Sequence, residues 1–173
     1  MSGPERILLI GMMGAGKTTV GRLLAGRLHC PYLDSDAQVE ARTGRTVPEI
    51  FAENGEAAFR AEETAALGEA LRLPPPLVVS VAGGAVLAEP NREMIRGAGR
   101  VVWLRARPET LARRVGSGAG RPLLDRDPAG SLARLDEVRR PLYAGLAGLV
   151  LDVDDLAPAQ VVERVEAWLR EAA

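Results

Sequence analysis

The strongest constraint on this chain is a glycine-rich loop that lies between an apolar segment and an amphipathic one. Residues 11–18 read Gly-Met-Met-Gly-Ala-Gly-Lys-Thr and match the pattern G-x-x-x-x-G-K-[ST] at every fixed position. The apolar residues 7–10 precede this loop, and apolar residues recur at helical spacing after Lys17. A strand, a glycine loop and a helix in this order predict a P-loop, which binds the phosphates of a nucleotide.

Lys17 is the single lysine among the 22 basic residues of the chain. An ammonium group on a thin stem reaches between phosphate oxygens in a tight loop where the planar guanidinium of arginine does not fit. We therefore expect Lys17 to contact the β- and γ-phosphates and the Thr18 hydroxyl to bind Mg²⁺. The residues expected to bind the nucleotide, ATP or GTP, in this loop are Gly14, Ala15, Gly16, Lys17, Thr18 and Thr19. The sequence argues against a switch GTPase, because a chain whose single lysine lies in this loop has no Asn-Lys-x-Asp guanine signature.

Apolar strands alternate with helical segments along the whole chain. Strands are predicted at 6–10, 32–34, 77–81, 101–104 and 149–153. Helices are predicted from 17 to about 28, as two short helices within 37–54, and then over 56–71, 90–96, 108–115, 129–146 and 158–170. This alternation predicts an α/β fold with a parallel sheet covered on both faces. We see no internal repeat or linker, so residues 1–173 are expected to form one domain.

Composition and charge narrow the class of protein further. The net charge is −1 and the pI is about 5.9, which argues against a general nucleic-acid-binding protein. Residues 100–140 nevertheless hold ten arginines and five acidic residues, a local balance of +5, while the rest of the chain sums to −6. This basic segment is a candidate surface for a polyanion, and the alternative is an ordinary solvated face.

The cysteine content and the absence of long apolar runs indicate a cytoplasmic protein. Cys30 is the single cysteine, so no internal disulfide forms and the chain suits a reducing compartment. We expect no signal peptide, and no apolar run approaches the roughly 20 residues that span a membrane. His29 has no partner at metal-binding spacing and is expected to end a helix. With no apolar face left over for a partner, a monomer is expected.

Two carboxylates, Asp34 and Asp36, lie where the second predicted strand ends. In an extended chain, residues two apart point to the same side, so both side chains are expected to face one space near the P-loop. One carboxylate can hold Mg²⁺ and its waters, and the other can orient a substrate hydroxyl or accept its proton. The alternative is that Ser35 or Asp36 only caps the next helix.

Arginines and bare backbone elsewhere are further candidates for ligand binding. Arg60 has Glu63 one helical turn away, which can orient its guanidinium. Gly83 and Gly84 end a buried strand, where a ligand can approach the backbone. Arg139 is followed by Arg140, and one of these two arginines can bind a carboxylate through two parallel hydrogen bonds. Alone, each of these features would be an ordinary surface pair or turn.

A glycine-rich segment at residues 116–122 breaks all periodicity. Such a segment inside a compact domain predicts a mobile lid, although a plain surface connection is the alternative. Arg121 lies in this segment and is expected to close over the transferred phosphoryl group.

With these motifs in order, the chain resembles the shikimate kinase family over nearly its whole length. Asp34-Ser35-Asp36 resembles the family's D-[ST]-D, and residues 51–63 resemble its more specific F-x-x-x-G-E-x-x-F-R-x-x-E. Residues 121–124 resemble R-P-L-L, and residues 139–143 resemble R-x-P-x-Y. One departure is Ala82, which replaces the first of three glycines and places the strand end in question, because alanine resists positive φ.

The resemblance implies a fold and an activity. The fold is the nucleoside monophosphate kinase type of P-loop NTPase, with sheet order 2-3-1-4-5, a lid at about 116–127 and a substrate-binding helical region at about 36–63. The activity is transfer of the ATP γ-phosphate to the 3-hydroxyl of shikimate, with Mg²⁺, on the route to chorismate and the aromatic amino acids.

The resemblance also implies the roles of individual residues. Lys17, Asp36 and Arg121 would be catalytic, with Asp36 on the reacting hydroxyl and Arg121 on the phosphates. Asp34 would hold Mg²⁺ through water. Arg114 would lie against the adenine, with Pro158 on its other side. The residues implied to bind shikimate are Asp36, Arg60, Gly83, Gly84 and Arg139, and the two arginines among them would clamp its carboxylate.

Two other functions are compatible with the P-loop. The first is another small-molecule kinase of this fold, such as a gluconate kinase; the D-[ST]-D and F-R-x-x-E motifs together argue against it. The second is a nucleotide-binding protein without catalysis. The intact set of Lys17, Thr18, Asp34, Asp36 and Arg121 argues against that alternative.

Overall fold

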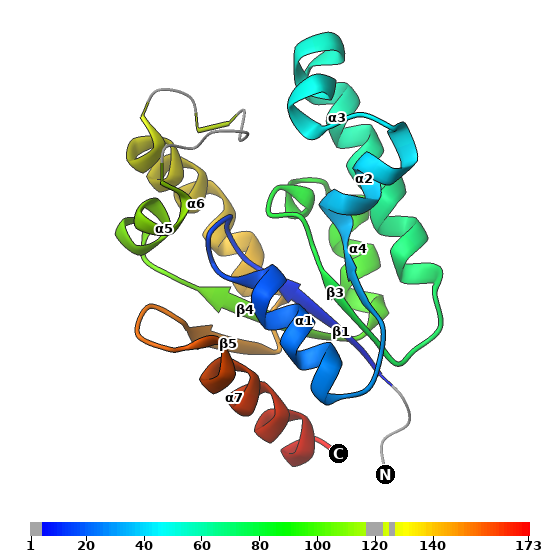
Figure 1. Cartoon of the computed structure of the whole chain (residues 1–173), viewed down its shortest axis with the longest axis vertical. Helices are drawn as coiled ribbons and strands as arrows, with labels where there is room; N and C mark the ends of the chain where they lie inside the picture. Colours follow the sequence, from blue (N-terminus) through cyan, green and yellow to red (C-terminus); the bar gives the residue numbers. More distant parts are fainter. Residues whose placement is uncertain (1–4, 117–122, 125–126) are drawn as a thin grey trace.

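The sheet has five parallel strands in the order β2-β3-β1-β4-β5, as predicted (Figure 1). The computed structural model describes residues 5–116, 123–124 and 127–173. The strands are β1 (Arg6–Ile10), β2 (Tyr32–Asp34), β3 (Leu77–Ser80), β4 (Arg100–Arg105) and β5 (Leu149–Asp152). Since all pairs are parallel, every carboxyl end of a strand lies at one edge of the sheet.

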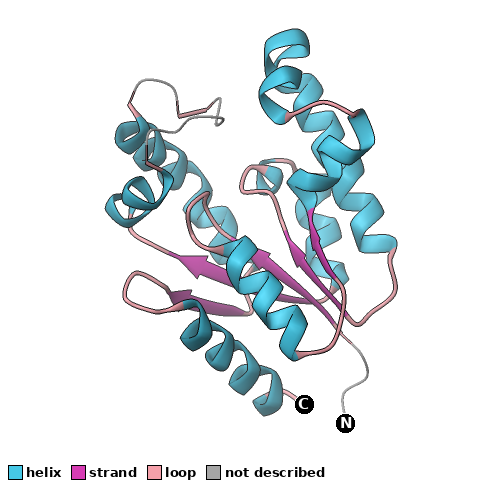
Figure 2. Ribbon diagram, in the orientation of Figure 1, coloured by secondary structure: helices cyan, strands magenta, loops and turns pink. Residues whose placement is uncertain are grey.

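Helices cover both faces of this sheet, which gives three layers (Figure 2). They are α1 (Lys17–Arg27), α2 (Ser35–Thr43), α3 (Val47–Arg72), α4 (Glu89–Ala98), α5 (Pro108–Val115), α6 (Pro128–Leu146) and α7 (Pro158–Glu171). A 3₁₀ turn, η1 (Ala85–Leu87), was not predicted. On one face, Arg27 of α1 forms an ion pair with Glu166 of α7 at 3.1 Å. No helix in the described ranges is long and apolar enough to cross a membrane.

The main core lies on both faces of the three central strands. Leu8, Val79 and Val102 have no exposed side-chain surface, as is typical of a parallel sheet sandwiched between helices. Aromatic residues are rare in the chain, and two of them, Trp103 and Tyr143, meet in this core with ring centroids 5.7 Å apart. Burial of aliphatic side chains therefore supplies most of the stabilisation.

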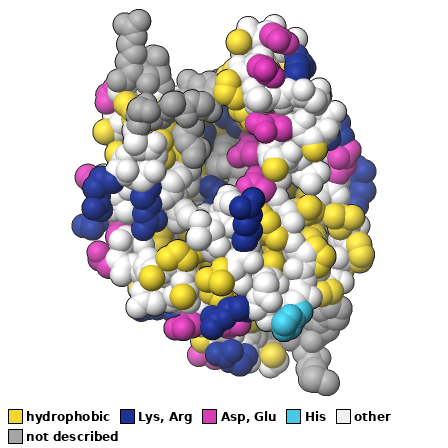
Figure 3. Space-filling view, in the orientation of Figure 1, with side chains coloured by type: hydrophobic (Ala, Val, Ile, Leu, Met, Phe, Trp, Pro, Cys, Tyr) yellow, Lys and Arg dark blue, Asp and Glu magenta, His cyan; other side chains and the backbone are white. Residues whose placement is uncertain are grey.

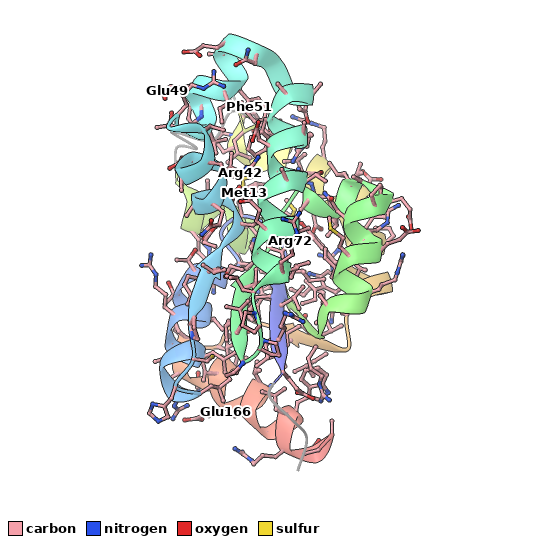
Figure 4. All side chains as sticks on the ribbon, turned by 90° about the vertical axis from the view of Figure 1, so that its right-hand side faces the viewer. Met13, Arg42, Glu49, Phe51, Arg72 and Glu166 are labelled. Atoms are coloured by element: carbon pink, nitrogen blue, oxygen red, sulfur yellow. The ribbon has the colours of Figure 1, made fainter. Side chains whose placement is uncertain are left out.

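A second, smaller apolar cluster holds α2 and α3 together. It consists of Val39, Ile50, Phe59 and Ala66, with Val47 and Phe51 packed against it. The two helices project from the sheet at its carboxyl edge (Figure 1 and Figure 4). The sequence predicted two short helices within 37–54 and a longer one from 56. In the structure the second short helix and the longer helix are joined as α3, with a break at Gly55 (φ 83°, ψ 176°).

Candidate active site

A cavity of about 490 Å³ opens at the carboxyl ends of β1, β2 and β3. Ligands of open parallel sheets bind at this edge, where the strand order reverses. The P-loop lines one side of the cavity, α2 and α3 line another, and the turn after β3 together with α6 closes the base. Figure 3 shows the hollow, with acidic side chains gathered on its α2 side.

The P-loop has the backbone that its glycines allow. Gly11, Gly14 and Gly16 have φ values of 143°, 84° and 95°, which strain any residue with a Cβ. At Gly11 a Cβ would also lie 2.6 Å from the Leu104 carbonyl oxygen. The Lys17 ammonium folds over the loop and donates to the carbonyl oxygens of Gly11 at 2.6 Å and Met12 at 3.1 Å. A cation is thus held at the mouth of the loop, where phosphates would lie.

A chain of hydroxyl groups ties the first turn of α1 to the sheet. Tyr32 donates to the Ser80 hydroxyl oxygen at 2.8 Å, and Ser80 donates to the Lys17 carbonyl oxygen at 2.9 Å. A side chain at Gly21 would collide with the Tyr32 ring. Sequence reasoning missed this network, because its hydrogen bonds join residues that are 48 and 63 positions apart.

Asp34 connects the P-loop to α2. Its Oδ2 accepts a hydrogen bond from the Thr18 hydroxyl at 3.1 Å, and its Oδ1 caps α2 by accepting from the N–H groups of Asp36 at 2.9 Å and Ala37 at 3.4 Å. The alternative of Ser35 or Asp36 as the cap was therefore wrong. The extended-chain argument was also wrong, because Asp36 lies in the first turn of α2. Both aspartates nevertheless line the same cavity.

Ser35 connects α2 to the turn after β3. Its side chain is fully buried, and its hydroxyl oxygen accepts from the Ala82 N–H at 2.7 Å. Ala82 is also buried and does not require positive φ: in the described ranges His29 is the one non-glycine residue in that region. The replacement of glycine at position 82 therefore leaves the strand end unstrained.

Arg60 projects from α3 across the turn after β3. Its Nη1 donates to both carboxylate oxygens of Glu63, at 2.9 and 3.1 Å, as expected. A side chain at Gly84 would collide with this guanidinium. Glu63 is 1% exposed, and burial raises its pKa from 4.5 to about 7, although Arg60 opposes the shift. The pair holds Arg60 at the wall of the cavity.

Arg139 is the most unusual residue of the site. It is 1% exposed on α6, and its Nε and Nη1 have no hydrogen-bond partner in the part of the chain that the structure describes. Buried guanidinium groups are costly unless an acceptor satisfies them. Because Arg139 lines the cavity, an anionic ligand there would supply that acceptor.

Arg114 and Asp154 shape the region beside the P-loop. Arg114 donates to the carbonyl oxygens of Gly14 at 3.3 Å and Val153 at 3.0 Å, and so bridges the P-loop and the loop after β5. Burial raises the pKa of Asp154, but hydrogen bonds from Thr110 and from Arg107 outweigh this effect and lower it to about 2.

The residues predicted to bind the nucleotide outside the P-loop do not all line the cavity. Pro158 begins α7 and is not among the residues that line the cavity. Arg121 and most of the predicted lid lie outside the described residues, whereas Leu123 lines the cavity. The described residues contain no cluster of three or more His, Cys, Asp or Glu that could hold a metal. The hydroxyl of Thr18 and the carboxylate of Asp34 both line the cavity beside the P-loop.

The fold and the cavity together define a P-loop kinase that acts on a small anionic molecule. The family model for shikimate kinase matches residues 13–170. The shikimate kinase of Pseudomonas savastanoi pv. phaseolicola is 43% identical over 168 residues, 96% of this chain and 97% of that protein. The chain belongs to the shikimate kinase family.

Solved structures agree with this assignment. Shikimate kinase from Acinetobacter baumannii in complex with shikimate has a TM-score of 0.94 and 37% identity, and the match covers 98% of this chain and 94% of that one. A gluconokinase from Sinorhizobium meliloti 1021 has a TM-score of 0.64 and 24% identity over 98% of this chain and 94% of that one, which shows a shared fold only.

Proposed function

We propose that this chain transfers the γ-phosphoryl group of ATP to the 3-hydroxyl of shikimate, which gives 3-phosphoshikimate and ADP. The observation that carries the proposal is the buried Arg139, whose Nε and Nη1 have no acceptor among the described residues and which lines a cavity shared with the P-loop. A carboxylate matches the fork of a guanidinium group in charge and geometry. Shikimate carries such a carboxylate and hydroxyl groups on one small ring.

The proposed pose places the two ends of shikimate on different elements. Arg139 of α6 and Arg60 of α3 clamp the carboxylate, and the N–H groups of Gly83 and Gly84 donate hydrogen bonds to it. Asp36 of α2 accepts a hydrogen bond from the 3-hydroxyl and orients its oxygen toward the γ-phosphate. As the new P–O bond forms and the bond to ADP breaks, the hydroxyl proton leaves toward Asp36.

The nucleotide is proposed to bind along the P-loop. The backbone of residues 14–19 and the Lys17 ammonium hold the phosphates, and the positive end of α1 adds to their attraction. Arg114 and Pro158 flank the adenine, and Arg121 closes over the transferred group. Thr18 would bind Mg²⁺ directly and Asp34 through water; both offer hard oxygen ligands, which lie 3.1 Å apart. When bound, Mg²⁺ would neutralise charge on the phosphates.

The organisation of the chain is proposed to remain as the sequence predicted. Residues 1–173 form one domain, with a lid at about 116–127 and a substrate-binding region at about 36–63. The apolar cluster of α2 and α3, which is separate from the main core, supports the second of these regions. We further propose a cytoplasmic monomer that binds neither nucleic acid nor membrane.

Release of ADP from Mg-ATP in the presence of different acceptors tests the proposed function. Shikimate should stimulate ADP release strongly, whereas gluconate should leave the rate at the level without acceptor. Asp36→Asn keeps the size of the side chain but removes its charge, so kcat should fall by about 10²-fold or more while ADP still binds in titration calorimetry. Turnover with gluconate and none with shikimate would replace this function with the gluconate kinase alternative.

A further inference from the structure

Tyr143 joins the two parts of the site that face the substrate carboxylate. It is fully buried on α6, and its hydroxyl donates to the Gly83 carbonyl oxygen at 2.7 Å. It follows Arg139 by one helical turn and so lies on the same face of α6. Contact with Trp103, whose ring centroid is 5.7 Å away, keeps the phenol ring in place.

The hydrogen bond from Tyr143 sets the direction of the next N–H group. The Gly83 carbonyl and the Gly84 N–H belong to one planar trans peptide, so they point in opposite directions. Holding the carbonyl on the α6 side turns the N–H toward the side where Arg60 crosses Gly84. Two successive glycines would otherwise leave this peptide free to rotate. Ser35 fixes the other end of the turn through the Ala82 N–H.

The same hydroxyl group also borders the guanidinium of Arg139. A Cβ at Gly83 would lie 3.4 Å from Arg139 Nη1 and 3.5 Å from the Tyr143 oxygen, so both atoms occupy the space directly beside this glycine. Burial raises the pKa of Tyr143 far above its ordinary value, although Arg139 opposes the shift. The phenol is therefore neutral at physiological pH and remains a donor to Gly83.

We propose that Tyr143 is a positioning residue for the substrate carboxylate: its hydroxyl fixes the Gly83–Gly84 peptide, beside the Arg139 guanidinium, in the orientation that receives it. This inference rests on the proposed function, because it takes the anion in the cavity to be shikimate. Tyr143 itself does not touch the reacting atoms.

Tyr143→Phe tests the proposal, since it removes the hydroxyl and keeps the ring. The KM for shikimate and its Kd from titration calorimetry should rise about tenfold, while kcat and the KM for ATP change less than about twofold. Tyr32→Phe is the matched control, because its hydroxyl supports the first turn of α1 through Ser80. Its effect should fall on the KM for ATP and leave the KM for shikimate within about twofold.

The methyl ester of shikimate separates positioning from general loosening. The ester lacks the charge that Arg139 would bind, so Tyr143→Phe should lose less than about twofold in kcat/KM with the ester. The losses from Tyr143→Phe and Arg139→Lys should also be less than additive, because both act on one contact. Ser35→Ala releases the other end of the turn and should give the same selective loss, which keeps the test valid should Tyr143→Phe fail to fold.

Three results would overturn the inference. The first is that the wild-type enzyme is active and the Tyr143→Phe variant has the same KM for shikimate as the wild type. The second is an equal loss toward shikimate, its ester and ATP, which would mean a merely structural role. The third is a wild type that does not bind or phosphorylate shikimate, and this result alone would also remove the proposed function.

Discussion

Glu63 shows how burial changes the chemistry of a pair that the sequence presents as ordinary. The spacing of Arg60 and Glu63 predicted their contact but gave no indication that Glu63 would be 1% exposed. Burial raises its pKa to about 7, and the charge of Arg60 only partly offsets the effect. The charge of this carboxyl group therefore changes within the physiological pH range, directly beside Arg60, which is proposed to bind the substrate.

Stability should consequently depend on pH through Glu63. Between pH 4.5 and about 7 the native state holds a proton that the unfolded state has lost, so the free energy of unfolding falls as pH rises. The contribution is fully present below pH 4.5 and is lost by about pH 7; it amounts to about 3 kcal/mol at most. Urea unfolding of the wild type and of Glu63→Gln across this range measures it. Parallel curves for the two proteins would show that Glu63 titrates normally.

The aspartates show which residues local sequence reasoning could place. Asp34 and Asp36 were correctly predicted to share a space, but the reason given was an extended chain, and α2 in fact begins at Ser35. The cap of that helix is Asp34, because its carboxylate reaches two N–H groups while it also accepts from Thr18. Competition among three neighbouring polar residues for one cap depends on tertiary contacts, which the local pattern does not contain.

At the scale of elements, the apolar runs predicted the strands and the P-loop predicted the helix that follows. The strand order was implied by the family resemblance and not by the periodicity. What remained hidden were contacts between distant elements, such as those of Ser35 with Ala82 and of Tyr143 with Gly83. Tyr143 lies within the recognised R-x-P-x-Y segment, yet nothing local indicates which carbonyl its hydroxyl meets.

The break in α3 gives a prediction at this scale. Gly55 has φ 83° in a helix that is otherwise regular, and a Cβ there would meet no other atom within 4 Å. Gly55→Ala should therefore destabilise through backbone strain alone, by about 1–3 kcal/mol. Gly97→Ala is the matched control in α4: it also has open space but no positive φ, and it should stabilise by about 0.4–1 kcal/mol. Thermal unfolding of both variants measures the contrast, and equal shifts would contradict it.

At the scale of the whole molecule, the residues proposed to bind the substrate lie on two parts of the chain, each with its own apolar cluster. Asp36 and Arg60 belong to α2 and α3, whose cluster is small and separate, whereas Gly83, Gly84 and Arg139 are anchored to the main core. A molecule bound between them joins the two parts. Ion pairs from Arg42 to Glu62 and Glu69 hold α2 to α3, so the two helices should respond as one unit.

Hydrogen exchange should therefore report shikimate binding far beyond the residues that touch it. Amides of α2 and of α3 before Gly55 should exchange about 100-fold more slowly at 100 times the Kd, because any opening that moves this pair away from the sheet must first release the ligand. ADP alone should protect residues 11–19 and leave α2 and α3 unchanged, since its proposed contacts lie in the P-loop. Shikimate protection confined to residues 82–84 and to α6 would mean that the substrate binds one cluster only, and Asp36 and Arg60 would then lose their proposed roles.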